Sequence, residues 1–86
     1  MERAECRFII EHDFDSRYIK NFVSKIIGVR SDVYFAKDNR KINAKSIIGL
    51  ISLNIAKDDE IVIYVSGKSE WQVEADLDKV VQILGE

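Results

Sequence analysis

Proline is absent from this sequence of 86 residues, which contains only one cysteine (Cys6), one histidine (His12) and four glycines. A single cysteine can form no intramolecular disulfide, which fits a reducing compartment such as the cytoplasm. One cysteine and one histidine are too few for a structural zinc site, so we expect neither a bound metal nor another cofactor. The low glycine and proline content also argues against a disordered or low-complexity chain.

Long apolar runs and an excess of charge of one sign are missing as well. A transmembrane helix needs about 20 consecutive apolar residues, and no run in the sequence approaches this length. The net charge of −2 comes from 13 basic and 15 acidic residues, which gives no basic footprint for nucleic acid or a membrane surface. The segment Met1–Glu5 has no signal-peptide pattern, and we expect a cytoplasmic protein.

The sequence does contain enough apolar material for one small core. Hydrophobic residues make up 47% of the chain and charged residues 33%. Because accessible surface scales with chain mass, folding of a chain this small buries roughly 60–65% of its unfolded surface. We therefore expect a single domain that spans residues 1–86.

Two periodicities predict the first elements of the chain. Apolar and polar side chains alternate over residues 6–11, as in a half-buried strand. An amphipathic helical pattern follows, with Asp15 or Ser16 placed to cap its start and Gly28 placed for a left-handed residue at its end. The apolar stripe of this helix comprises Ile19, Phe22, Val23, Ile26 and Ile27.

The rest of the chain predicts a hairpin, a short helix, a strand and a last helix. The turn dipeptide Asp38–Asn39 joins the two hairpin strands. Ser46 is placed to cap the short helix, while Ser69 and Gln72 form a capping box for the last helix, which ends at Gly85. The predicted strands cover residues 32–37, 40–43 and 60–66.

The resulting order is β-α-β-β-α-β-α. A tight hairpin in the middle of the chain makes the sheet largely antiparallel. The stripes on the helices then predict an α+β fold, an open-faced β-sandwich in which three helices cover one face of a four-stranded, mainly antiparallel sheet.

The short helix carries more apolar side chains than one core-facing stripe can bury. Ile47, Ile48 and Ile51 form an apolar patch beside Ser46, and part of it must face solvent or a partner. Elsewhere, Cys6 reads as a buried strand residue without a redox role. Trp71, on the first turn of the last helix, is as suited to covering the sheet edge as to contacting a partner.

The segment Lys41–Leu53 reads Lys-Ile-Asn-Ala-Lys-Ser-Ile-Ile-Gly-Leu-Ile-Ser-Leu. It resembles the corresponding stretch of HPr, the phosphocarrier protein of the bacterial sugar phosphotransferase system, although two isoleucines replace methionines of the family. The resemblance extends over essentially the whole chain. It implies the open-faced sandwich of that family and its two phosphorylation sites.

The first of these sites is a histidine that starts the first helix and accepts phosphate from enzyme I. Alignment without gaps places Asp15 at this position. The arginine of the motif is kept as Arg17, whereas its glycine is Asp13 and its proline is Tyr18. The resemblance therefore implies no histidine phosphotransfer and no catalytic residue, as in the catabolite-repression HPr proteins, which also lack this histidine.

Two side chains remain as alternative phosphate acceptors. Asp15 is placed as a helix cap, but a carboxylate at a helix N-terminus can also accept a phosphoryl group, usually with a divalent ion. Glu11 and Asp13 add negative charge that repels an incoming phosphate. His12 offers an imidazole, three positions before the site, and needs a rebuilt loop to act as acceptor.

The second site of the family is a serine that a kinase phosphorylates with ATP, and it aligns with Ser46. Its hydroxyl is compatible with both capping and modification. The resemblance and the apolar patch together predict that Arg17, Lys45, Ile47, Ile48 and Ile51 bind the phosphate or a partner.

The resemblance implies a non-catalytic regulatory protein with two protein partners, an HPr-type kinase and a transcription regulator. We expect a monomer. Neither nucleic acid nor a membrane is an expected direct partner. The residues leave two alternatives open. One is a phosphocarrier with a changed acceptor, Asp15 or His12. The other is an HPr scaffold that binds an unrelated partner through its apolar patch.

Overall fold

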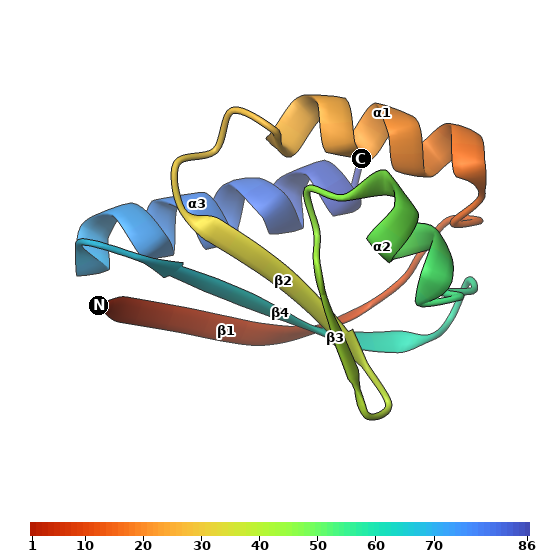
Figure 1. The fold of residues 1–86 in the computed structure, drawn as a ribbon, viewed down its shortest axis with the longest axis horizontal. Helices are drawn as coiled ribbons and strands as arrows, with labels where there is room; N and C mark the ends of the chain where they lie inside the picture. Colours follow the sequence, from red (N-terminus) through yellow and green to blue (C-terminus); the bar gives the residue numbers. More distant parts are fainter.

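The four strands form one antiparallel sheet with the order β1-β4-β2-β3, so β1 and β3 are its edges. The computed structural model describes residues 1–86, and the chain runs through the predicted β-α-β-β-α-β-α order (Figure 1). The predicted fold class is thereby confirmed. The elements are β1 (Glu2–Ile9), α1 (Ser16–Ile26), β2 (Asp32–Lys37), β3 (Arg40–Asn43), α2 (Ile47–Ser52), β4 (Glu60–Gly67) and α3 (Glu70–Leu84).

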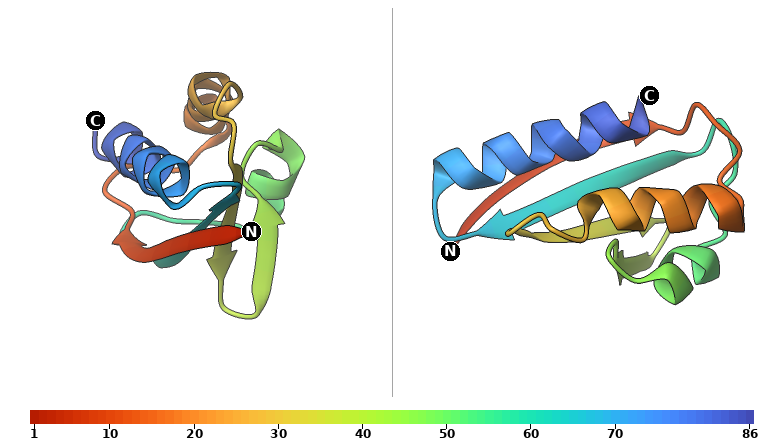
Figure 2. Two further views of the ribbon diagram at one scale, coloured as in Figure 1. Left: turned by 90° about the vertical axis from the view of Figure 1, so that its left-hand side faces the viewer. Right: turned by 90° about the horizontal axis from the view of Figure 1, so that it is seen from above.

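All three helices lie on the same face of the sheet, and the opposite face is open (Figure 2). The end-on view of Figure 2 shows α1 between the other two helices, with α3 on the side of β1 and α2 on the side of β3. Helix α3 contacts β1 and β4, whereas α2 contacts β3 and α1. None of the helices combines the length and the apolar character needed to cross a membrane.

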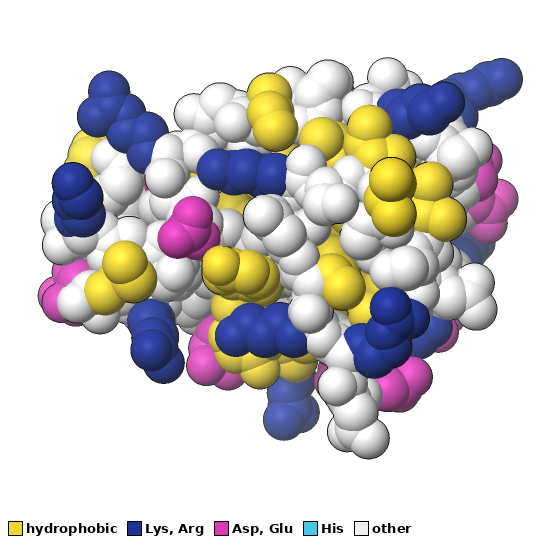
Figure 3. All heavy atoms as spheres, viewed as in Figure 1, with side chains coloured by type: hydrophobic (Ala, Val, Ile, Leu, Met, Phe, Trp, Pro, Cys, Tyr) yellow, Lys and Arg dark blue, Asp and Glu magenta, His cyan; other side chains and the backbone are white.

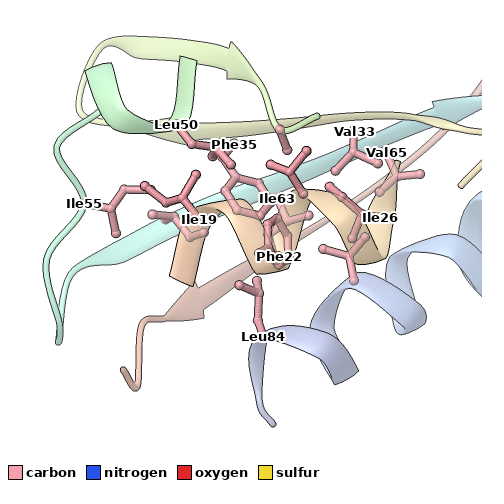
Figure 4. Packing of buried hydrophobic residues seen from close by; sticks show 14 of the residues in the cluster. Ile19, Phe22, Ile26, Val33, Phe35, Leu50, Ile55, Ile63, Val65 and Leu84 are labelled. Carbon is pink, nitrogen blue, oxygen red and sulfur yellow. The ribbon is translucent and has the colours of Figure 1, made fainter. Parts of the chain in front are cut away.

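The core lies between the helices and the sheet (Figure 4). Phe22 of α1 packs against Phe35 of β2 with ring centroids 5.5 Å apart. Burying one such side chain stabilises the fold by about 1.5–3 kcal/mol before entropy is counted. The predicted stripe on α1 is buried at all its positions except Ile27, which is exposed. The same core cluster contains Val33, Phe35, Ile61, Ile63 and Val65 of the sheet and Val73, Val80 and Leu84 of α3.

The first strand begins earlier and ends earlier than its alternating pattern predicts. It starts at Glu2 because the first residues pair with the end of β4, where Glu2 lies opposite Gly67. Cross-strand pairing thus extends the strand through a stretch whose side chains carry little apolar signal. Ile10 lies beyond the strand, although its N–H still donates to the carbonyl oxygen of Asp59 at 2.9 Å.

The predicted left-handed end of α1 is wrong. The helix ends at Ile26, Ile27 caps it in a right-handed conformation, and no glycine in the chain has a positive φ. The end is instead closed by the Ile27 N–H, which donates to Val23 O, and by the Val29 N–H, which donates to Ile26 O, both at 2.9 Å. These bonds turn the chain without a left-handed residue.

The capping box of α3 forms only in half. Ser69 Oγ accepts the N–H of Gln72 at 3.1 Å, but the Gln72 side-chain amide donates to Asp76 Oδ1 at 3.0 Å. Asp76 is 6% exposed and also accepts the N–H and the hydroxyl of Ser31. A buried carboxylate needs such donors, so the glutamine serves the core network and not the cap.

Glycine at position 67 is required by this same network. A Cβ at Gly67 would lie 3.0 Å from Ser31 Oγ and 3.1 Å from Val73 Cγ1. The close approach of β4 to the start of α3 therefore depends on the missing side chain.

Candidate functional site

Asp15 is the N-terminal cap of α1. Its Oδ1 atom accepts the N–H of Tyr18 at 2.9 Å, and its carbonyl oxygen accepts the N–H of Ile19 at 2.9 Å. The carboxylate is exposed and is used for a bond that a serine or asparagine makes equally well. Of the two predicted caps, Asp15 and Ser16, the structure thus has Asp15 as the cap and Ser16 as the first helical residue.

The loop before α1 is closed by aromatic side chains. Phe14 is buried, with its ring centroid 5.1 Å from that of Tyr18 and 6.4 Å from that of Phe22. His12, an exposed residue, lies with its ring centroid 5.9 Å from that of Tyr18. Partial burial raises the pKa of the Tyr18 phenol, with a smaller contribution from the carboxylates of Glu86 and Glu11. The tyrosine at the motif's proline position therefore anchors the loop as a neutral aromatic side chain.

The acidic residues of this loop do not assemble into a metal site. No group of three or more histidine, cysteine, aspartate or glutamate side chains in the chain is placed to hold a metal ion. Glu11, Asp13 and Asp15 are each exposed. A metal-assisted route to an aspartyl phosphate thus has no ready-made ligand set at this position.

Arg17 lies in the first turn of α1 and is exposed. Its guanidinium forms no ion pair and no side-chain hydrogen bond. The side chain is therefore free to meet an anionic group of a ligand or partner.

Ser46 is the N-terminal cap of α2, as the sequence predicts. Its Oγ accepts the N–H of Gly49 at 3.0 Å, and its carbonyl oxygen accepts the N–H of Leu50 at 3.0 Å. The side chain is partly exposed, and its hydroxyl proton donates to no protein acceptor. In the cap, Ser46 Oγ acts only as a hydrogen-bond acceptor. Phosphorylation, which replaces the hydroxyl proton, therefore breaks no hydrogen bond that the serine donates.

Lys45 does not point its charge at Ser46. Its Nζ atom donates to the carbonyl oxygen of Ser31 at 3.0 Å and, more closely, to that of Val29. Both acceptors lie in the loop between α1 and β2. The lysine thus fastens the residue before Ser46 to this loop, and the structure does not bring it together with the serine hydroxyl as a phosphate ligand.

The three predicted patch residues on α2 lie on different faces. Ile48 is 80% exposed and Ile51 is 49% exposed, whereas Ile47 is partly buried and packs against the core. Leu50 and Leu53 are buried and hold the helix on the fold. We call Ile48 and Ile51 the α2 apolar surface. Figure 3 shows hydrophobic side chains gathered over the region of α1 and α2 on this side of the molecule.

Two cationic side chains, Arg40 and Lys37, bind carbonyl oxygens at the C-terminal end of α2, and the sequence does not predict these contacts. Arg40 donates to the hydroxyl of Ser52 at 3.1 Å and also to its carbonyl oxygen. Lys37 donates to the carbonyl oxygen of Asn54 at 2.6 Å and pairs with Asp59 at 2.9 Å. Cations stabilise the carbonyl end of a helix, but only the tertiary packing of the hairpin on α2 brings these two side chains there.

Trp71 and Cys6 are both more exposed than the buried positions considered for them. Trp71 is 76% exposed, which rules out the alternative that it covers the sheet edge. Cys6 is only partly buried, because it lies on the edge strand β1. Burial raises the pKa of its thiol, and the charge of Asp78 raises it further. The thiol is therefore not activated as a nucleophile.

Comparison with known proteins assigns the chain to a family. Residues 3–83 match the family model described as the PTS HPr component phosphorylation site. The HPr-like protein Crh of Bacillus subtilis is 38% identical over 61 residues, which cover 71% of this chain and 72% of that protein. The crystal structure of the phosphocarrier protein HPr from Bacillus anthracis superposes with a TM-score of 0.84 at 25% identity, covering 94% and 95% of the two chains.

This chain belongs to the HPr family. HPr and HPr-like proteins are not themselves enzymes, and we assign no enzymatic activity to the chain. The crystal structure of Bacillus subtilis Crh has a TM-score of 0.74 at 27% identity, over 99% of this chain and 94% of that one, and is described as a dimer with swapped domains. The expectation of a monomer therefore has no support from this relative.

Proposed function

We propose that this protein is a regulatory member of the HPr family that is phosphorylated on Ser46 by an HPr-type kinase and then binds a transcription regulator through α2. It takes no part in histidine phosphotransfer. Its place of action is the cytoplasm, where the kinase finds ATP and where this family works.

The observation that carries the proposal is the arrangement at the start of α2. Ser46 presents a partly exposed hydroxyl, and Ile48 and Ile51 expose apolar side chains on the same short helix. A kinase must grip residues beside its acceptor, and a partner that recognises a phosphate also needs apolar contact area. The helix supplies both within six residues.

A phosphate on Ser46 changes what a partner meets more than it changes the fold. It adds about −2 in charge and three strong acceptor oxygens. Because Lys45 donates to Val29 and Ser31, this lysine is already engaged. The cations that clamp the phosphate are then supplied by the partner, most effectively as an arginine that donates two parallel bonds.

The start of α1 supports the loss of the histidine relay. A relay needs a neutral nitrogen nucleophile, and Asp15 brings a carboxylate that is already used as a cap. His12 is exposed beside the Tyr18 ring and precedes the helix by four positions. Neither side chain reproduces the chemistry of a histidine at the start of the helix.

The test is phosphorylation by HPr kinase with ATP, followed by mass spectrometry of peptides. We expect one phosphate on Ser46 in the wild type and none in Ser46→Ala. Ser24→Ala serves as the matched control, because Ser24 is an exposed helical serine whose hydroxyl donates to a backbone carbonyl. Failure of kinases from several organisms that carry this system to modify Ser46 contradicts the proposal and favours a scaffold with an unrelated partner.

The role of the α2 apolar surface is tested on the phosphorylated protein. We expect Ile48→Ala and Ile51→Ala to weaken binding to a transcription regulator of the HPr-responsive type, with little change in melting temperature. Ile27→Ala is the control, since Ile27 is 59% exposed at the end of α1. Equal affinities for all three variants would remove the α2 apolar surface from the proposal.

A further inference from the structure

Trp71 is the only tryptophan of the chain, and 76% of it is exposed. Tryptophan is on average among the more buried residue types, so this degree of exposure is unusual. The residue lies in the first turn of α3, and it does not belong to the core cluster. A large rigid aromatic side chain kept in water contributes little to folding and is well suited to contact a partner.

The indole borders a shallow hollow of about 670 Å³ on the outer side of α3. Glu70, Glu74 and Asp78 follow one another four residues apart, so they form a row along one side of the helix. None of these three carboxylates takes part in an ion pair. We call this hollow the Trp71 face; its lining residues are Glu70, Trp71, Glu74, Ala75 and Asp78.

The chemistry of the Trp71 face fits one kind of side chain best. Three unpaired carboxylates beside an exposed indole attract a cation, and the face of an indole ring adds a cation–π contact. A guanidinium stacks on an aromatic ring and donates two parallel bonds to a carboxylate at the same time. An ammonium lacks this planar fork. The lysines nearest in sequence, Lys68 and Lys79, do not line the hollow.

We propose that the Trp71 face is a second docking surface, which binds an arginine-bearing basic segment of a partner protein. It is separate from the α2 apolar surface, because α1 lies between α3 and α2 in the end-on view of Figure 2. The charge complementarity defines the occupant: an acidic, aromatic face selects a basic, planar side chain. Binding here does not depend on Ser46 or on any phosphate.

Because the chain has one tryptophan, its intrinsic fluorescence reports on the Trp71 face directly. The probe is acetylated hexa-arginine amide, titrated at about 0.15 M ionic strength, where long-range attraction is largely screened. We expect the peptide to change the emission of Trp71 and to bind about two- to fivefold more tightly than hexa-lysine amide of equal charge. An uncharged glycine–serine hexapeptide should leave the emission unchanged.

Substitutions separate this face from a general effect of net charge. We expect Glu74→Gln and Asp78→Asn each to weaken hexa-arginine binding about two- to fivefold. Asp58→Asn removes the same charge from the exposed turn before β4, where asparagine tolerates the φ of 77°, and should leave the affinity unchanged. Trp71→Leu, measured by calorimetry, should weaken binding by a similar factor while the circular dichroism spectrum stays that of the wild type.

Three results would overturn the proposal. One is the absence of any binding of hexa-arginine to the wild type. Another is an equal loss of affinity in Asp58→Asn and Glu74→Gln, which would assign the attraction to net charge. The third is unchanged affinity in folded Trp71→Leu, which would show that the indole is not part of the contact.

Discussion

The starts of α1 and α2 use the same local device but differ in what surrounds it. Asp15 and Ser46 each accept the N–H of the residue three positions later, at 2.9 and 3.0 Å. Around Asp15 the loop is closed by buried Phe14 and partly buried Tyr18, whereas Ser46 leads into a helix with exposed Ile48. A cap therefore reveals little about function until its side-chain chemistry and its neighbours are considered. Of these two capping residues, only Ser46 combines a modifiable hydroxyl with exposed apolar side chains on the helix that it caps.

The largest expected effect is the difference in stability between substitutions on the buried side and on the exposed side of α2. Leu50 is fully buried and Ile48 is 80% exposed, although only one residue lies between them. Leu50→Ala should lower the free energy of unfolding by about 2–5 kcal/mol, and Ile48→Ala should change it by less than about 0.5 kcal/mol. Urea denaturation of both variants measures the difference. Similar losses would mean that Ile48 supports the fold and is not a free contact residue.

The next largest effect tests the role of Lys45. Loss of its bonds to Val29 and Ser31 in Lys45→Met should cost about 2 kcal/mol, because hydrogen bonds from a charged donor are the stronger ones. Lys20→Met, at an exposed position of α1 without a hydrogen bond, is the control and should be nearly neutral. Thermal melts of the two variants give the values. If Lys45→Met instead keeps full stability but loses affinity of the phosphorylated protein for its regulator, Lys45 is a phosphate ligand after all.

Removal of either cap should lower stability by the same amount, but only removal of Ser46 should affect function. Asp15→Ala and Ser46→Ala should each lower stability by about 1 kcal/mol, the usual loss on removing a cap. Asp15→Ser keeps the capping oxygen and should recover most of that loss. Only Ser46→Ala should abolish modification by the kinase, as measured by mass spectrometry of all three variants. If Asp15→Ala keeps its fold but is no longer phosphorylated on Ser46, the start of α1 also contributes to recognition by the kinase.

The smallest expected effect is the pH dependence of stability that comes from Asp59, the partner of Lys37 in an ion pair. The hydrogen bond from Lys37, with a second from the Ala56 N–H, lowers the pKa of Asp59 below its ordinary value of 3.8. A lowered folded-state pKa stabilises the protein above the unfolded-state pKa, and this contribution disappears as pH falls through the folded-state value. Wild type should therefore exceed Asp59→Asn in stability at pH 7, and the gap should close below about pH 4. A gap that persists at pH 2 would contradict this assignment.

Most of the fold follows from patterns that lie within single segments. The stripe on α1, the hairpin at Asp38–Asn39 and the caps at Ser46 and Ser69 are local features, and the structure has each of them. The errors occur where distant residues decide the outcome. Pairing with β4 extends β1 to Glu2, and hydrogen bonds near the helix end remove the need for a left-handed Gly28.

The candidate site could be predicted in position but not in orientation. Alignment places Ser46 and the isoleucines together, but the sequence does not tell that Ile47 faces inward while Ile48 and Ile51 face outward. The sequence also does not show that the Lys45 side chain donates to a carbonyl oxygen of the loop before β2. Such directions depend on how α2 packs on β3 and α1, which no local pattern encodes.

The most direct test compares the two helix starts in one preparation. One half of the protein is incubated with enzyme I and labelled phosphoenolpyruvate, the other half with HPr kinase and labelled ATP. We expect stoichiometric label on Ser46 in the second half and none in the first. Asp15→His should restore little label from enzyme I, because Asp13 and Tyr18 also alter the loop. Stoichiometric acid-labile or hydroxylamine-labile label in the first half, on His12 or Asp15, together with an unmodified Ser46 in the second, would contradict this expectation.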